Sequence, residues 1–358
     1  MKSILMYLNI PWDFIKQRPQ FMAEKLSQYF NVLAYYNRPY RKTYLVQGSK
    51  KTTQLNLIAK PKIPRKTNVL KKIDNAMQHV FLKKYIEQYE YIWVMHPEQY
   101  EILRNKIAGK KVIYDCMDDY SQFPYLSETQ KKYLQAIEKD LVSRADYIFY
   151  TSKTLQDVHQ LRYKSKKKTY VVNNGFEPIK RLEEDRQVRD FIEKVGGKKL
   201  IYIGAIAEWF DVELVQTILQ DRHDISVILF GPLEIELPHI ERLHYYGKIP
   251  HSSIYTAMQY ADILIMPFKI NPLIKAVDPI KVYEYIDSGK PVLVPEYEEM
   301  EKFNHYVTIY KDVEECNKKL ASLLKETVAN NLEPFRQDNT WQARAQRIYE
   351  LLDNEEIV

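Results

Sequence analysis

The side chains best suited to chemistry are Lys281 and Glu284, which lie three residues apart. On a helix this spacing puts both on one face. An ammonium beside a helix N-terminus suits a diphosphate. A carboxylate one turn further on can accept hydrogen bonds from two ribose hydroxyls. A plain Glu–Lys pair on a solvated surface is the alternative, and the spacing alone leaves both open.

The residues around this pair predict a short helix over 279–288. Asp278 suits the N-cap and Pro279 the first helical position. Gly289 suits the position just after the C-terminus, where a left-handed conformation is common. Asp278 therefore has a structural explanation as a cap.

Three carboxylates, Asp115, Asp118 and Asp119, lie at the end of an apolar strand expected over 111–115. Neighbouring carboxylates raise one another's pKa, which suits a general base for an acceptor hydroxyl. Loop caps and Asx turns are the alternative.

Four further side chains are weaker candidates. Arg18 and Gln20 follow the first strand, where they could contact a substrate phosphate or begin a helix. His96, next to Pro97, could donate to a sugar or phosphate, or be structural. Trp209 could stack on a sugar face or pack in a core.

Strands alternate with longer helical patterns along the whole chain, which predicts parallel sheets covered on both faces. In the first half the expected strands are 3–9, 31–36, 54–58, 91–95, 111–115, 146–151 and 169–173, and the expected helices are 17–29, 68–88, 98–107, 127–144 and 153–161. In the second half the strands are 199–203, 225–230, 242–246, 262–266, 291–294 and 306–309, and the helices are 211–220, 251–260, 279–288, 311–326 and 338–353.

A chain of 358 residues exceeds one typical core. We expect an α/β protein with two Rossmann-like, doubly wound domains, 1–176 and 177–337, and a C-terminal helix, 338–358, that completes the first. Ligands bind at the carboxyl ends of such strands, so we expect the domains to face each other across a cleft. Gly204, Gly231 and Gly247 follow strands of the second half and suit close approach to a ligand, or ordinary turns.

Charge is unevenly distributed. Residues 1–178 hold 31 Lys and Arg against 16 Asp and Glu, whereas residues 179–358 hold 22 against 31. An anionic membrane face, a phosphorylated lipid carrier and nucleic acid are candidate partners. A solvated lysine-rich surface is the alternative, and no nucleic-acid recognition motif is present. The basic clusters are Lys50–Lys51, 60–72, Lys83–Lys84 and 164–168.

Targeting and metal signals are lacking. The two cysteines form no disulfide or metal-ligand pattern. The start lacks a cleavage site, and no stretch approaches the ~20 apolar residues of a membrane span. We expect a cytoplasmic protein, peripheral on the inner face of the plasma membrane.

The run from Glu284 to Val292 resembles the E-x-x-x-x-G-x-P-V signature of GT-B glycosyltransferases, particularly glycosyltransferase family 4. A closer resemblance is to bacterial envelope-polysaccharide transferases of the teichuronic-acid type. Pieces in matching order support both: Trp12 to Gln20, Tyr114 to Asp119, Asn174-Gly175, Gly204 to Asp211, Gly247, Asp262 to Pro267, Asp278 to Tyr285, and Trp341 with Arg344.

This resemblance implies a GT-B fold with the acceptor in the first domain and a nucleotide sugar, expected to be a UDP-sugar, in the second. It implies no cofactor and no obligatory metal. Glu284 matches the ribose-binding glutamate, the backbone at Lys248 and Ile249 matches the base-reading segment, and Gly204 opens the donor-phosphate loop that contains Trp209. The implied reaction transfers a hexose to a hydroxyl of an envelope, capsule or exopolysaccharide glycan, carried on a lipid or free, with retention favoured.

Two departures from the family pattern keep alternatives open. Ala276 stands where the family has a second glutamate, and Asp278 is the nearest carboxylate to replace it. The usual basic pair after the first strand of the second domain is missing, which leaves phosphate charge to Lys281, Lys275 or the helix N-terminus. An inverting enzyme would need a base such as Asp118 or Asp119. A non-catalytic GT-B subunit and a nucleotide-sugar epimerase are the other interpretations.

Overall fold

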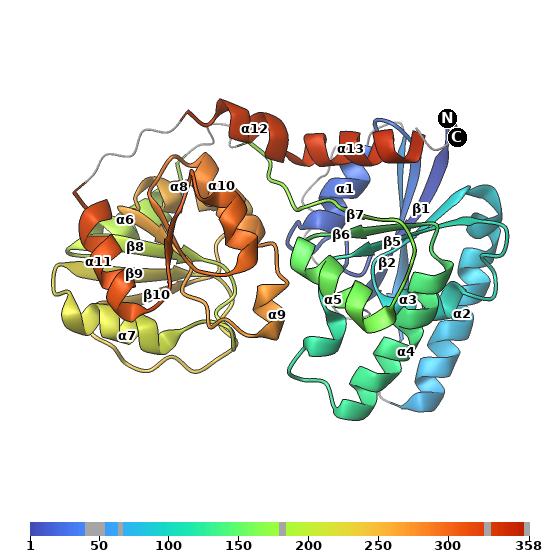
Figure 1. Ribbon diagram of the computed structural model, residues 1–358, viewed down its shortest axis with the longest axis horizontal. Helices are drawn as coiled ribbons and strands as arrows, with labels where there is room; N and C mark the ends of the chain where they lie inside the picture. Colours follow the sequence, from blue (N-terminus) through green and yellow to red (C-terminus); the bar gives the residue numbers. More distant parts are fainter. Residues whose placement is uncertain (40–53, 64–66, 179–183, 326–330, 354–358) are drawn as a thin grey trace. The chain divides into compact units, whose positions relative to one another are not determined.

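The computed structural model describes residues 1–39, 54–63, 67–178, 184–325 and 331–353. These form two compact units (Figure 1): unit 1 is Met1–Asn174 with the chain from Trp341 onward, and unit 2 is Gly175–Thr340. Each unit has one parallel sheet, and helices lie between most of its successive strands in the described chain. Among the described helices, none is both long enough and apolar enough to cross a bilayer.

Unit 1 has a seven-stranded sheet in the order β3-β2-β1-β4-β5-β6-β7. Its first strand is central and buried from Ile4 to Tyr7, which explains the apolar run at the start of the sequence. The order reverses at this strand, which pairs with β2 on one side and β4 on the other. The strands are β1 (Ser3–Tyr7), β2 (Asn31–Pro39), β3 (Leu55–Lys62), β4 (Tyr91–Val94), β5 (Lys111–Cys116), β6 (Tyr147–Tyr150) and β7 (Thr169–Val171).

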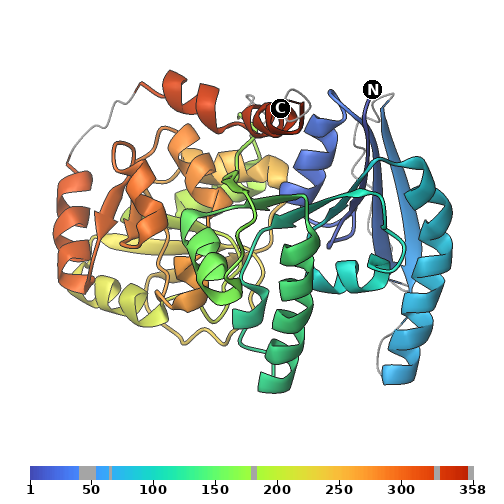
Figure 2. The same ribbon diagram turned by 45° about the vertical axis from the view of Figure 1, so that its right-hand side comes forward.

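The helices of unit 1 include the last one in the described chain. In α13, Trp341 stacks on Phe21 of α1 with ring centroids 5.1 Å apart, and Arg344 donates to the carbonyl of Asn174 at 2.9 Å. The two helices lie side by side in both views (Figures 1 and 2). The helices are α1 (Arg18–Leu26), α2 (Asn68–Gln88), α3 (Pro97–Leu103), the 3-10 helix η1 (Tyr120–Gln122), α4 (Glu128–Arg144), α5 (Lys153–Tyr163) and α13 (Trp341–Asp353).

Unit 2 has a six-stranded sheet in the order β10-β9-β8-β11-β12-β13, which reverses at β8. Helix α6 packs against α8, and α7 packs against α11. The strands are β8 (Lys198–Ile203), β9 (Ile225–Phe230), β10 (Leu243–Gly247), β11 (Ile263–Ile265), β12 (Val292–Pro295) and β13 (Thr308–Tyr310). The helices are α6 (Arg186–Lys194), α7 (Val212–Asp221), α8 (His251–Gln259), α9 (Pro272–Lys275), α10 (Ile280–Asp287), η2 (Glu298–Phe303), α11 (Val313–Leu323) and α12 (Glu333–Asn339).

The two parallel sheets with alternating helices confirm the predicted α/β class. One local prediction is wrong: helix α10 begins at Ile280 with Pro279 as its N-cap, so Asp278 is not the cap residue. The predicted end is confirmed, because Gly289 follows the C-cap Ser288 with a φ of +72°.

Candidate functional site

Three glycines bring the backbone together at the carboxyl ends of neighbouring strands in unit 2. The Gly204 N–H donates to the carbonyl of Phe230, and the Gly231 N–H donates to that of Gly247, both at 2.8 Å. A Cβ built on Gly231 would lie 1.9 Å from the Gly204 carbonyl oxygen. Since that atom is backbone, no side chain fits at Gly231, and the ends of β8 and β9 approach each other closely.

Lys281 comes to this backbone from the first turn of α10. Its Nζ donates to the Tyr202 hydroxyl at 2.9 Å and lies 4.6 Å from the ring centroids of both Tyr202 and Phe268. A Cβ on Gly204 would be only 2.6 Å from the same Nζ. The structure thus brings Lys281 and Gly204 together, with the ammonium held by aromatic faces.

The pKa of Lys281 lies close to neutral pH. Burial lowers its pKa to about 7, against an opposing effect of the Glu284 charge. Among the described residues, no carboxylate oxygen lies within 4.0 Å of its Nζ. A bound anion would supply the missing counter-charge and favour the protonated form.

Glu284 lies one turn along α10, with its side chain 19% exposed. Its Oε1 is 3.3 Å from Nε2 of His251, the first residue of α8. The exposed Lys248 and the partly buried Ile249 follow β10, and Pro250 separates them from this histidine. The predicted base-reading residues thus lie two or three positions before the histidine that contacts Glu284. Sequence reasoning missed His251, although its place behind Gly247 and Pro250 was the available signal.

Trp209 lies in the loop after Gly204 and is half-buried against the core of unit 2. Its side chain interacts with the Tyr202 hydroxyl, and its carbonyl accepts from Lys269 N at 2.8 Å. These contacts fit the core-packing interpretation. They also make Trp209 a support for the tyrosine that holds Lys281.

Asp278 is a buried carboxylate just before α10. Its two carboxylate oxygens accept hydrogen bonds from the Tyr283 hydroxyl at 3.0 and 3.1 Å. The ammonium of Lys302 in η2 forms an ion pair with it at 2.7 Å. Its side chain has no exposed surface. The carboxylate therefore fixes the start of α10 and would act on a substrate through that helix.

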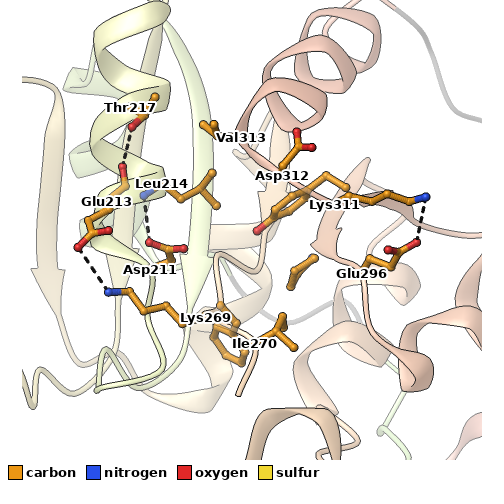
Figure 3. A pocket seen from close by; sticks show the side chains of 13 residues that line it. Asp211, Glu213, Leu214, Thr217, Lys269, Ile270, Glu296, Lys311, Asp312 and Val313 are labelled. Carbon is orange, nitrogen blue, oxygen red and sulfur yellow. Dashed lines mark hydrogen bonds and ion pairs between the residues drawn. The ribbon is translucent and has the colours of Figure 1, made fainter. Parts of the chain in front are cut away.

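A separate hollow of about 400 Å³ lies at the N-termini of α7 and α11 (Figure 3). Lys269 pairs with Glu213 at 3.8 Å, and Lys311 with Glu296 at 3.7 Å. Asp211 and Asp312 cap the two helices. Because its charges are engaged with one another, we assign it no ligand. Its lining is Asp211, Glu213, Leu214, Thr217, Phe268, Lys269, Ile270, Pro295, Glu296, Tyr310, Lys311, Asp312 and Val313.

In unit 1, Arg18 is buried rather than open to substrate. It donates to both carboxylate oxygens of Asp115 at 2.8–3.1 Å. It also donates to the carbonyls of Val172 and Asn173 at 2.9 and 3.1 Å. Only 2% of Arg18 and none of Asp115 is exposed. Arg18 is the first residue of α1, which fits the alternative of a helix-start role. Its pairing ties α1 to β5 and to the end of β7.

Gln20 and His96 both have helix-start roles. The Gln20 side chain accepts from the backbone N–H of Gln17 in a capping box and is buried. His96 is the N-cap of α3, where Nδ1 accepts from the N–H of Glu98 at 3.1 Å and the ring packs edge-on against Tyr120. In both cases the structural alternative describes the observed contacts.

The pKa values of Asp118 and Asp119 are shifted in opposite directions. Burial followed by the charge of Asp119 raises the pKa of Asp118 to about 6. Burial alone would raise the pKa of Asp119 too, but hydrogen bonds and charge from Arg162 lower it below its ordinary value. Asp119 is thus a structural anion, whereas Asp118 has the proton affinity of a general base.

A buried group behind these aspartates contains Cys116, Glu138 and His159, whose ligand atoms lie within 4.8 Å of one another. The thiol faces His159 Nδ1 at 3.8 Å, whereas the carboxylate faces Nε2 at 3.9 Å. A metal ion would bind only one ring nitrogen of His159. The thiol of Cys116 lies beside Nδ1 and the carboxylate of Glu138 lies beside Nε2, so one ion at either nitrogen would face only one of these two groups. Tyr114 and Tyr163 both donate to Glu138, so the group fits a hydrogen-bonded support for the β5–η1 loop.

Comparisons with known proteins find a curated relative over part of the chain and solved structures of the same fold. No family model matches the sequence. A Bacillus subtilis (strain 168) protein named as a teichuronic acid biosynthesis glycosyltransferase, TuaH, is 26% identical over 229 residues. The match covers 59% of this chain and 57% of that relative, so it spans little more than half of the relative's length.

Solved structures match over nearly the full chain. A sucrose-phosphate synthase from Thermosynechococcus elongatus has a TM-score of 0.77 at 14% identity, covering 100% of both chains. Anabaena HepE, solved with UDP and glucose, has a TM-score of 0.69 at 14% identity, covering 98% of this chain and 99% of that one. A UDP-forming trehalose-phosphate synthase from Burkholderia xenovorans has a TM-score of 0.71 at 8% identity, covering 98% of this chain and 100% of that one. Identities this low show the fold, which is GT-B.

Proposed function

We propose that this GT-B chain transfers a sugar from a UDP-sugar to a hydroxyl of an envelope, capsule or exopolysaccharide glycan. The observation that carries the proposal is the Lys281 ammonium held against Gly204, with Glu284 one turn further along the same helix. The name of the Bacillus relative supports the glycan class. The UDP and UDP-glucose complexes of HepE support the donor.

In this proposal the donor diphosphate lies against Gly204 and the N-terminus of α10. Lys281 stabilises the negative charge that builds on the leaving UDP oxygen as the glycosidic bond breaks. Glu284 accepts hydrogen bonds from the ribose hydroxyls. Because a fixed ammonium and a helix terminus meet the phosphate charge, we propose a metal-independent reaction.

We further propose that the product retains the donor's anomeric configuration, as the resemblance to family 4 implies. Inversion would require a base in unit 1, and Asp118, with its pKa near 6, would be that base. The configuration of the new bond, read by NMR, decides between the two. We place the reaction in the cytoplasm, at the inner face of the plasma membrane, with a lipid-linked acceptor.

Glu284→Ala is expected to weaken UDP binding at least tenfold, because hydrogen bonds to a charged group contribute about 1.5–3 kcal/mol each. Calorimetric titration with UDP, GDP, ADP and dTDP measures this and identifies the base. Glu213→Ala is the matched control, since Glu213 is an exposed glutamate of the same unit. Equal affinity of Glu284→Ala and wild type would remove Glu284 from the ribose site.

Asp278→Asn is expected to weaken nucleotide binding and lower the melting temperature together, because the loss of charge loosens Lys302 and the start of α10. Binding titrations and thermal unfolding measure the two effects. A fall in kcat with unchanged affinity and melting temperature would instead make Asp278 a catalytic residue.

Transfer itself is tested by following UDP release from UDP-sugars with and without glycan acceptors. Release that depends on an acceptor supports the proposal. Release without one would indicate an epimerase, and tight binding with no release under any condition would indicate a non-catalytic subunit.

A further inference from the structure

The solvent face of α2 is apolar. Val69 is 66% exposed, Ile73 45%, Met77 48% and Val80 75%. They are spaced by four, four and three residues, which forms one continuous stripe along a helix. From Val69 to Val80 the stripe runs for roughly 16 Å at the rise of an α-helix. Four large aliphatic side chains therefore stand together in water on one face of unit 1.

Two polar side chains of α2 point away from the stripe and are buried. Asp74 and Gln78 are fully buried together with Leu82 and Ile86. The Asp74 carboxylate pairs with Lys60 of β3 at 3.1 Å, and Gln78 accepts from the hydroxyl of Tyr7 in β1. A helix that only had to cover a sheet would present polar residues to solvent where Val69, Ile73, Met77 and Val80 stand. The fold thus does not account for the outward aliphatic stripe.

Lysines flank this stripe. Lys72, Lys83 and Lys84 are all exposed on the same side of the helix, where Glu87 is the one exposed acidic residue of α2. Helical geometry places Lys72 and Lys83 along one border of the stripe, whereas Lys84 lies in line with the stripe, one turn beyond Val80. Aliphatic side chains bordered by lysines match the interior and the headgroups of an anionic bilayer. The further predicted cluster, Lys50–Lys51, lies outside the described residues.

We infer that the α2 face, defined as Val69, Ile73, Met77 and Val80 with Lys72, Lys83 and Lys84, docks on an anionic lipid surface. The helix lies parallel to the membrane, with its aliphatic side chains below the headgroups and its lysines among the lipid phosphates. In both views α2, in light blue, lies on the surface of unit 1 (Figures 1 and 2). The inference deepens the proposed function, since a lipid-linked acceptor would be held at the same surface.

The test is sedimentation of the full chain with vesicles, without donor or acceptor. Wild type is expected to bind vesicles of equal parts phosphatidylcholine and phosphatidylglycerol and to bind pure phosphatidylcholine much less. Val69→Ser, Ile73→Ser, Met77→Ser and Val80→Ser combined should lose at least tenfold in partitioning to either vesicle. Lys72→Gln, Lys83→Gln and Lys84→Gln combined should lose on the order of fivefold per lysine, on anionic vesicles only.

Leu233→Ser with Val313→Ser is the matched control, because both are exposed apolar residues of unit 2; it should bind as wild type does. Unchanged melting temperature and UDP affinity show that each variant is folded. Absence of wild-type binding to anionic vesicles, or equal binding by the stripe variant, would overturn the inference. So would a wild-type dimer that the stripe variant converts to a monomer, since a second copy would then cover the face. None of these outcomes depends on sugar transfer, which is measured separately with a soluble acceptor.

Discussion

Replacing Arg18 by methionine is expected to lower the free energy of unfolding by about 3–5 kcal/mol, the largest stability effect of any substitution proposed for this chain. The substitution leaves the carboxylate of Asp115 in the core of unit 1 with no cation beside it. It also removes the donor that the carbonyls of Val172 and Asn173 share. Removing one partner of a buried ion pair destabilises a protein far more than replacing both partners by apolar residues, because it leaves a buried charge without a counter-charge.

Urea unfolding followed by circular dichroism measures the change, and hydrogen exchange of the β5 amides assigns it to unit 1. Arg18→Met combined with Asp115→Leu should recover most of the loss. Arg189→Met, which breaks an exposed set of ion pairs in unit 2, should change stability little. If Arg18→Met behaved like Arg189→Met, the Arg18–Asp115 pair would not hold the unit together.

Lys281→Met is expected to weaken binding of UDP-glucose on the order of 10- to 100-fold, the largest effect on the donor site. Methionine keeps the stem between Tyr202 and Phe268 but removes the charge that the diphosphate would meet. Charge-assisted hydrogen bonds are about twice as strong as neutral ones. Titration calorimetry measures the loss, with Lys290→Met, at a half-buried lysine just after α10, as the control that should bind normally.

The pH dependence gives a second readout of Lys281. Its pKa in the free protein is lowered to about 7, and a bound diphosphate raises it. Below pH 7 the ammonium is already present, so affinity should be flat. Above pH 7 binding requires uptake of a proton, so the dissociation constant should rise by about tenfold per pH unit until the pH reaches the pKa of the complex. Lys281→Met should show no such slope, and a slope in the variant equal to that of wild type would assign the titration to another group.

Elements with a clear periodic pattern were predictable from the sequence. Helix α2 has the expected bounds, 68–88, and the short apolar strands at the start of each unit lie in the centre of each sheet. Helix α6 was not predicted, since its buried residues, Val188 and Ile192, are few among many charges. Short helices such as α9 carry too few residues to show a period.

The site was predictable only where its members are close in sequence. The spacing of Lys281 and Glu284 and the position of Gly204 could be read from the chain. The contacts of Tyr202 and His251 with α10 could not be read, because these residues reach the helix from other elements, through hydrogen bonds that span 79 and 33 residues. Asp278 was predicted to be a helix cap from its neighbours in the sequence. Its actual partner, Lys302, lies 24 residues further on and could not be recognised from the local pattern.

The position of α13 has a consequence for synthesis. The helix that covers Phe21 in unit 1 is encoded after all of unit 2. While the ribosome adds residues 175–340, on the order of ten to thirty seconds at ordinary rates, unit 1 has its sheet but not its last helix. We therefore expect unit 2 to complete folding first. During that interval the exposed side of α1 is a surface that a chaperone, or another nascent chain, would encounter before α13 arrives.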